Sequence, residues 1–268
     1  MIAAMWSNGG VVGFGVAALW LLAGCGNGQS PTEAARLAEA RRAEEAAKTP
    51  DVVDALFLGS GPLIPRDGSS DCPLQGFWSG YPRGTAVRMR VSSHVPGPAR
   101  AALASAAGPV AGATGGALTV IIETTAELDP QPGVNEVTVA EVALPRAAGC
   151  PSDAGCVQYR FAGRGLLMGA RVVEPRERSV TAYVHDAVGH GALGLCHVDA
   201  RLIGGAENSL MSAGPGVPPG SGAPSLTGLD LDAIRAVYAS GVNPGAARST
   251  FLAARLVNLQ AGQLPRKP

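Results

Sequence analysis

The sequence predicts an α+β fold, because segments with the apolar period of a strand occur in the same chain as segments with the composition and length of helices. The clearest strand lies at residues 86–92, where Val87, Met89 and Val91 alternate with two arginines. A period of two is typical of a half-buried strand. An alanine-rich stretch at Pro98–Ala113 separates this strand from the next one and is expected to be a helix.

The other elements follow in chain order. Further strands are expected at Leu118–Thr125, Val134–Leu144, Cys156–Phe161 and Leu166–Val173. Two more helices are expected, one from Ser179 to about Leu193 and one at Asp230–Tyr238. Thr227 and Asp230 are candidate N-terminal caps of the last helix, because their side-chain oxygens can accept hydrogen bonds from its free backbone N–H groups.

The composition allows one or two folded domains with a sizeable core. The chain has 268 residues, of which 46% are hydrophobic, and its formal net charge is zero. It contains no long basic block, so nucleic-acid binding has no electrostatic support, and no nucleic-acid partner is expected.

Residues 1–25 have the pattern of an export sequence. The segment Val11–Ala23 is uncharged and mostly apolar, and its length suits the apolar core of a signal peptide better than a membrane span. It ends in Leu22-Ala-Gly-Cys25, which resembles the lipobox of bacterial lipoproteins. This resemblance implies that Cys25 is lipidated and that the exported protein is anchored to a bacterial membrane, at the cell envelope or surface. A plain signal peptide or an apolar N-terminal anchor is the alternative, because residues 1–10 contain no lysine or arginine.

The rest of the chain is expected to form four parts. Residues 26–50 are rich in Ala, Glu and Arg and are expected to be a tether helix or linker. Residues 51–84 are rich in Gly, Pro and Ser and are expected to pack as an irregular N-terminal segment against the main domain. The main domain is expected at residues 85–240, and residues 241–268 are expected to form a C-terminal helical tail.

Three of the four histidines, His185, His190 and His197, lie in one apolar, glycine-containing stretch, Tyr183–Asp199. Neutral imidazole is the commonest protein ligand of zinc. The stretch therefore predicts a metal site, with zinc as the expected ion. A methionine in a loop, Met211, follows this stretch.

These residues resemble the active site of the matrixin branch of the metzincin zinc peptidases. The family pattern is His-Glu-x-x-His-x-x-Gly-x-x-His, followed by a methionine turn. Here His185-Asp186 stands in place of His-Glu, and His190 and His197 follow in order. The resemblance implies that the three histidines bind zinc and that Asp186 is a shortened general base. It also implies that Met211 forms an apolar floor beneath the metal.

The resemblance covers about residues 85–240 and carries expectations for fold and function. It implies a zincin-like, twisted and mostly parallel sheet with an antiparallel edge strand, and a metal-site helix packed beneath the sheet. It also implies an extracytoplasmic peptidase that hydrolyses a peptide or protein substrate through metal-activated water. The loop Pro215–Pro224 lies where the family places the wall of its specificity pocket. The alternative is a catalytically inactive zincin-fold surface lipoprotein that acts as a binding or structural module.

The spacing of the histidines departs from the family pattern. His185 and His190 are five residues apart instead of four, and His190 and Gly194 are four apart instead of three. On a regular α-helix, residues five apart point about 140° away from each other and could not bind one ion. A π-bulge between His185 and Gly194 would restore a common face. Alternatively, Asp186, four residues before His190, is the first ligand, and the usual base is missing.

An even number of cysteines remains if Cys25 is lipidated, which indicates disulfides in an exported protein. Cys150 and Cys156 flank a turn-rich pentapeptide and are expected to pair. Cys72 and Cys196 either form a second disulfide, or Cys196 stays free beside the metal.

Overall fold

The computed structural model describes residues 51–66 and 72–251. These described residues all belong to one compact unit. The expected lipidation site Cys25, the expected tether at residues 26–50 and most of the C-terminal tail lie outside the described residues. Within the described part, no helix combines the length and the apolar character that crossing a membrane requires.

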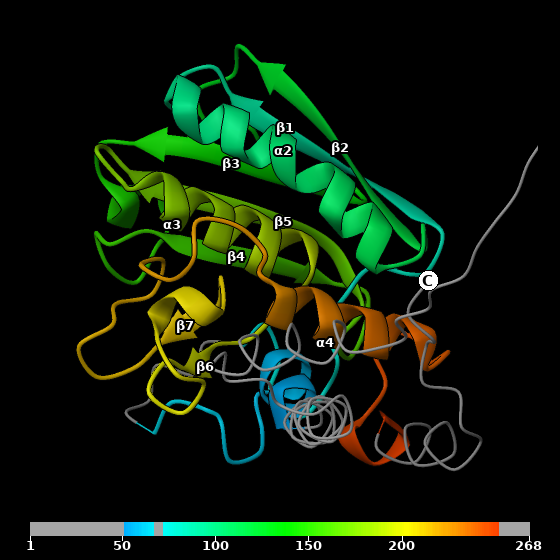
Figure 1. The fold of residues 1–268 in the computed structure, drawn as a ribbon. Coiled ribbons are helices and arrows are strands. Elements are labelled where there is room, and N and C mark those ends of the chain that lie inside the picture. The colour runs from blue at the N-terminus through cyan, green and yellow to red at the C-terminus, as the bar shows by residue number, and fades with distance from the viewer. Residues whose placement is uncertain (1–50, 67–71, 252–268) are drawn as a thin grey trace, which may run out of the picture. The chain divides into compact units, whose positions relative to one another are not determined.

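Five strands form a mixed sheet. They are β1 (Thr85–Ser92), β2 (Leu118–Thr125), β3 (Glu136–Val142), β4 (Cys156–Phe161) and β5 (Leu167–Pro175). Their order in the sheet is β2-β1-β3-β5-β4 (Figure 1). Strands β2, β1, β3 and β5 are parallel, whereas β4 is antiparallel to β5 and forms one edge. The predicted α+β class and the mixed, mostly parallel sheet are therefore confirmed.

The alternation at residues 86–92 determines which face of β1 is buried. Val87, Met89 and Val91 lie in the core, as predicted. Arg88 points to the opposite face, where it forms an ion pair of 2.8 Å with Glu123 on β2. One face of the sheet therefore carries the apolar core.

The site is positioned by helices on this apolar face. They are α2 (Gly97–Ala113), α3 (Val180–Val184) and the π-helix η2 (His185–Ala192). Helix α4 (Gly228–Ala239) follows the site in the chain and contacts α2. Helices α2 and α3 lie on the same face of the sheet and contact each other (Figure 1). Because η2 continues α3 and packs against β3, β4 and β5, the histidine-bearing segment is fixed near the antiparallel edge of the sheet.

The segment before β1 belongs to the same core. Residues 51–58 form a helix, where the sequence predicts irregular structure. Trp78 is fully buried and makes edge-to-face contacts with three rings, those of Phe57, Tyr238 and Phe251, at centroid distances of 6.0, 5.4 and 6.2 Å. Such contacts between large apolar side chains stabilise a core. The N-terminal segment, α4 and the beginning of the tail thus pack around one tryptophan.

Helix α4 begins with the capping residues that the sequence predicts. The Asp230 backbone N–H donates to the Thr227 hydroxyl, and the Thr227 backbone N–H donates to the Asp230 carboxylate. The buried Asp230 carboxylate also accepts hydrogen bonds from the Ser209 hydroxyl at 2.6 Å and the Leu210 N–H at 2.9 Å. The start of α4 is thereby tied to the loop that contains Met211.

Candidate metal centre

The helix that carries the histidines has π geometry where the spacing requires it. His185–Ala192 is π-helical, and the Leu193 N–H donates to the Val188 carbonyl oxygen, five residues earlier, at 3.0 Å. Hydrogen bonds over five residues bring side chains five apart to nearly the same face. His185 and His190 therefore point the same way. The predicted π geometry is confirmed, and it extends over eight residues rather than a single bulge.

The three histidine side chains converge. The Nε2 atom of His197 lies 2.9 Å from Nε2 of His185 and 3.0 Å from Nε2 of His190. All three side chains are buried, and one ring nitrogen of each lies within 4.8 Å of the others, a geometry that could hold a metal ion. Asp186 does not belong to this group. The geometry therefore favours His185 over Asp186 as a first ligand.

Backbone carbonyls determine which ring nitrogen carries the hydrogen. Nδ1 of His185 lies 2.8 Å from the Leu210 carbonyl oxygen, and Nδ1 of His190 lies 2.7 Å from that of Leu195. A carbonyl oxygen can only accept, so each Nδ1 donates its hydrogen. In the neutral rings, Nε2 then keeps a free lone pair. Hydrogen bonds of this kind orient imidazole ligands in metal sites.

His190 is held in its neutral form. Burial, and then the interaction with His185, lower the pKa of His190 to about 4. At neutral pH the ring is thus uncharged, which is the form that binds a metal. Nε2 lone pairs that face each other repel unless a cation or a proton lies between them. The cluster is therefore suited to a positive ion at its centre.

Gly194 forms the turn between His190 and His197. Its φ is +68°, in the left-handed region that favours glycine. A Cβ atom at this position would lie 2.1 Å from the carbonyl oxygen of Ser79. Both the backbone conformation and the close approach of Ser79 thus require glycine at this turn.

Met211 packs directly against the π-helix. It is fully buried, and a Cβ atom at Gly189 would lie 2.1 Å from its Sδ atom. The methionine therefore fills the space that the glycine leaves open, in a position that suits an apolar floor. Asp199 accepts a hydrogen bond from the Arg201 N–H at 2.9 Å and lies outside the three-histidine group, so it orients the local backbone.

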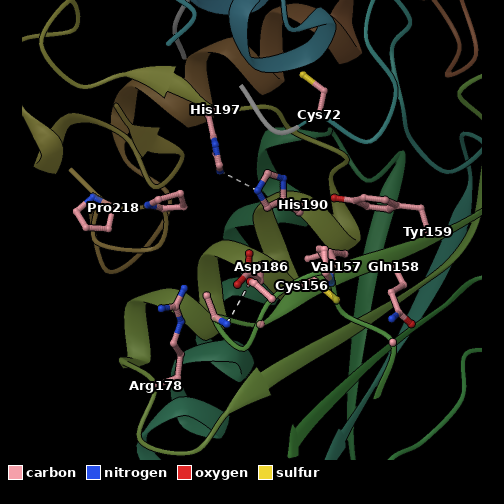
Figure 2. Close-up of a pocket in the computed structure, with 16 residues that line it drawn as sticks. Cys72, Cys156, Val157, Gln158, Tyr159, Arg178, Asp186, His190, His197 and Pro218 are labelled. Carbon is pink, nitrogen blue, oxygen red and sulfur yellow. Dashed lines mark hydrogen bonds between the residues drawn. The ribbon is translucent and has the colours of Figure 1, made fainter. Parts of the chain in front are cut away.

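A cleft of about 540 Å³ opens beside the histidines. Its lining includes His190, His197 and Asp186, part of the edge strand β4, and the loop residues Pro218 and Pro219 (Figure 2). Both prolines belong to the loop Pro215–Pro224, which the resemblance places at the wall of the specificity pocket, and this loop thus lines the cleft. An edge strand has backbone groups free to pair with an extended peptide. The cleft therefore combines possible metal ligands, a carboxylate and the edge strand of the sheet.

Asp186 interacts with a glutamate that the sequence did not single out. Glu174, near the end of β5, is fully buried. Its pKa is raised well above the ordinary value, first by burial and then by the hydrogen-bonding contact with Asp186 and the negative charge of that residue. Burial also raises the pKa of Asp186, but Glu174, His185 and His190 outweigh this effect and the net shift is downward. Glu174 thus keeps its proton while Asp186 is ionised.

Two disulfides lie next to the cleft. Cys150 pairs with Cys156, as predicted, and Cys72 pairs with Cys196, so Cys196 is not a free thiol. Because Cys196 directly precedes His197, the second bridge ties this histidine to the segment before β1. Disulfides persist in oxidising compartments such as the cell exterior.

Other functional groups could not be recognised from their residue type. Leu195 and Leu210 contact the histidines through their main-chain oxygens. The positions of these oxygens depend on the fold and cannot be predicted from the leucine side chains. Glu174 does carry a signal in the sequence. It follows Val172 and Val173 in an apolar strand, and a glutamate is seldom fully buried unless it has a partner. Its place in the strand therefore indicates a buried polar partner.

Comparison of the chain with models of known families, with characterised proteins and with solved structures gives no match. The function must therefore be argued from the site itself, which consists of three convergent imidazoles, an ionised carboxylate and a cleft along an edge strand.

Proposed function

We propose that this protein is a matrixin-like, zinc-dependent peptidase that acts outside the cytoplasm. The observation that carries the proposal is the convergence of the Nε2 atoms of His185, His190 and His197 beside a cleft that contains Asp186. Three histidines and an open fourth position form a common type of catalytic zinc site. The two disulfides and the lipobox-like sequence at Cys25 support an exported, lipid-anchored protein.

The donor set fits zinc in chemistry and in spacing. His185 and His190 donate their Nδ1 hydrogens to backbone carbonyls, which leaves the Nε2 lone pairs as ligand atoms. Two nitrogens bound to a tetrahedral zinc ion at 2.0–2.1 Å are about 3.4 Å apart. The observed Nε2 separations of 2.9 and 3.0 Å would need to widen by about 0.4 Å, a small movement of two rings. When bound, the ion would polarise a carbonyl group and a water molecule as a Lewis acid.

Asp186 is our candidate for the general base. It directly follows His185 and lines the cleft. Because its pKa is lowered, Asp186 is ionised at neutral pH and can accept a proton from the attacking water. Asp186 then returns this proton to the nitrogen of the scissile bond as the C–N bond breaks, so that an amine and a carboxylate leave.

Strand β4 is the candidate binding edge for the substrate. Val157, Gln158 and Tyr159 on β4 line the cleft. An extended peptide added to this edge would receive main-chain hydrogen bonds, which give affinity without demanding one sequence. A peptide or protein substrate suits this surface better than a small compact molecule does.

The test measures bound zinc and cleavage of a fluorogenic peptide library in the same preparations. His190→Ala should lose most of its zinc and all cleavage. Asp186→Asn should keep one equivalent of zinc and lose activity by about 10²-fold or more. His94→Ala is the matched control, because His94 is exposed and lies outside the cluster, and it should retain both zinc and activity.

Two results would change the proposal. A wild-type protein that holds zinc but cleaves no peptide would favour the inactive binding or structural module. If Asp186→Ala loses the metal while His185→Ala keeps it, then Asp186 is a ligand, and the assignment of the base is wrong.

A further inference from the structure

Beyond Asp186, the cleft contains a guanidinium group. Arg178 lines the cleft together with Asp186, Pro218 and Pro219. Figure 2 shows its side chain extending toward the space between Pro218 and Asp186. The side chain is 29% exposed, so its charge is partly shielded from water yet open to a ligand. None of the other residues that line the cleft is a lysine or an arginine.

The guanidinium is only partly engaged by the protein. Its Nε atom lies 3.2 Å from Oε2 of Glu174 but without the alignment of a hydrogen bond. Among the residues that the structure describes, no hydrogen bond to either terminal nitrogen is formed. The loop beyond Pro219 comes close, since a Cβ atom at Gly220 would lie 3.7 Å from Nη2 of Arg178. The end of the guanidinium is thus confined but unpaired.

Few acidic groups compete with an incoming anion for Arg178. Asp186 is the one acidic residue among those that line the cleft, and Glu174 is fully buried and does not line it. A carboxylate that enters this end of the cleft therefore meets the terminal nitrogens of the guanidinium.

We propose that Arg178 forms a carboxylate-binding subsite, so that the protein prefers peptides with a carboxylate beside the bond to be cleaved. This proposal rests on the proposed peptidase function and names its substrate class. The two terminal nitrogens of a guanidinium match the two oxygens of a carboxylate and can bind it with parallel, charge-assisted hydrogen bonds. The carboxylate can belong to an Asp or Glu side chain or to the C-terminus of a short peptide.

The experiment measures peptide binding by isothermal titration calorimetry on the zinc-loaded, Asp186→Asn protein, in which cleavage is suppressed. The probes are acetylated alanine hexapeptide amides in which one Glu or one Gln occupies each position in turn, and a third set with a free C-terminal carboxylate. At one position, Glu should bind about tenfold more tightly than Gln, the size of one hydrogen bond to a charged group. A gain confined to the free-acid peptides would assign the subsite to the C-terminus.

Two arginine variants in the same background decide whether Arg178 is responsible. Arg178→Gln should abolish the preference for a carboxylate. Arg178→Lys should keep only part of it, because lysine retains the charge but lacks the two terminal nitrogens that bind both carboxylate oxygens. Arg176→Gln removes the same charge from an exposed residue outside the cleft, and its preference should be unchanged. If Arg178→Gln does not fold, the lysine variant and the loss of the preference at high salt provide the test.

The outcomes separate this proposal from the peptidase function. Equal binding of the Glu, Gln and free-acid peptides, a preference for a carboxylate that survives in Arg178→Gln, or no binding of any peptide would overturn the subsite. Wild-type cleavage without such a preference would keep the peptidase and remove the subsite. A preference that depends on Arg178, without cleavage by the wild type, would keep the subsite and remove the peptidase.

Discussion

Replacing Gly194 with alanine tests whether the turn between the second and third histidines depends on glycine. The φ of +68° at this position would cost an alanine about 1–2 kcal/mol. The new methyl group would also lie 2.1 Å from the carbonyl oxygen and 2.7 Å from the carbonyl carbon of Ser79. Because these are backbone atoms, the chain must move, at a cost of about 1–3 kcal/mol. Gly194→Ala should therefore lower the free energy of unfolding by about 2–5 kcal/mol.

The assay is equilibrium unfolding in urea, with Gly112→Ala as the matched control. Gly112 is exposed on α2, and an added Cβ atom would have no neighbour within 4 Å. The control should gain about 0.5–1 kcal/mol, because alanine favours helix more than glycine does. Zinc affinity of Gly194→Ala, measured by chelator competition, should fall by about tenfold or more, since the turn directs His197. A Gly194→Ala protein with the stability and zinc affinity of the wild type would refute the reasoning.

Two further predictions concern the buried glutamate and the disulfides. The raised pKa of Glu174 means that, above its ordinary value of 4.5, the folded protein binds more protons than the unfolded chain, so this residue lowers stability as pH rises. The free energy of unfolding of Glu174→Gln, measured in urea, should therefore rise relative to that of the wild type as the pH increases from about 5 to about 9. If the free energies of the two proteins instead change in parallel with pH, Glu174 is not a buried neutral acid. Replacing Cys72 and Cys196 with serine should cost about 5 kcal/mol, and replacing Cys150 and Cys156 about 2 kcal/mol, because the closed loops span 124 and 6 residues. A larger loss for the short loop would contradict this estimate.

Local patterns predicted the secondary structure well where the pattern is strong. The alternation in β1 and the capping residues of α4 are local features, and both are present. The helix at residues 51–58 was missed because its apolar residues, such as Val52 and Leu56, lie on most sides of the helix. A helix buried all round lacks the one-sided stripe that identifies a surface helix. The mostly parallel sheet with an antiparallel edge strand was implied by the family resemblance, and the order of the strands was not predicted, since pairing between distant segments is not a local property.

The site was predictable where chemistry and spacing constrain each other. Three histidines can share one ion only if the helix departs from α geometry, so the extra residue between His185 and His190 implied the π-helix. The partners of the site could not be found in this way. The carbonyl of Leu210 reaches His185 because Asp230 holds the intervening loop, and this arrangement exists only in the folded chain.

X-ray absorption at the zinc edge tests the central claim most directly. The wild type, loaded with zinc and dialysed, should hold one equivalent in a site with three imidazole nitrogens at about 2.0–2.1 Å. His190→Ala should lose this spectrum and most of the metal. A wild type without stoichiometric zinc, or a zinc spectrum dominated by oxygen ligands, would contradict the account.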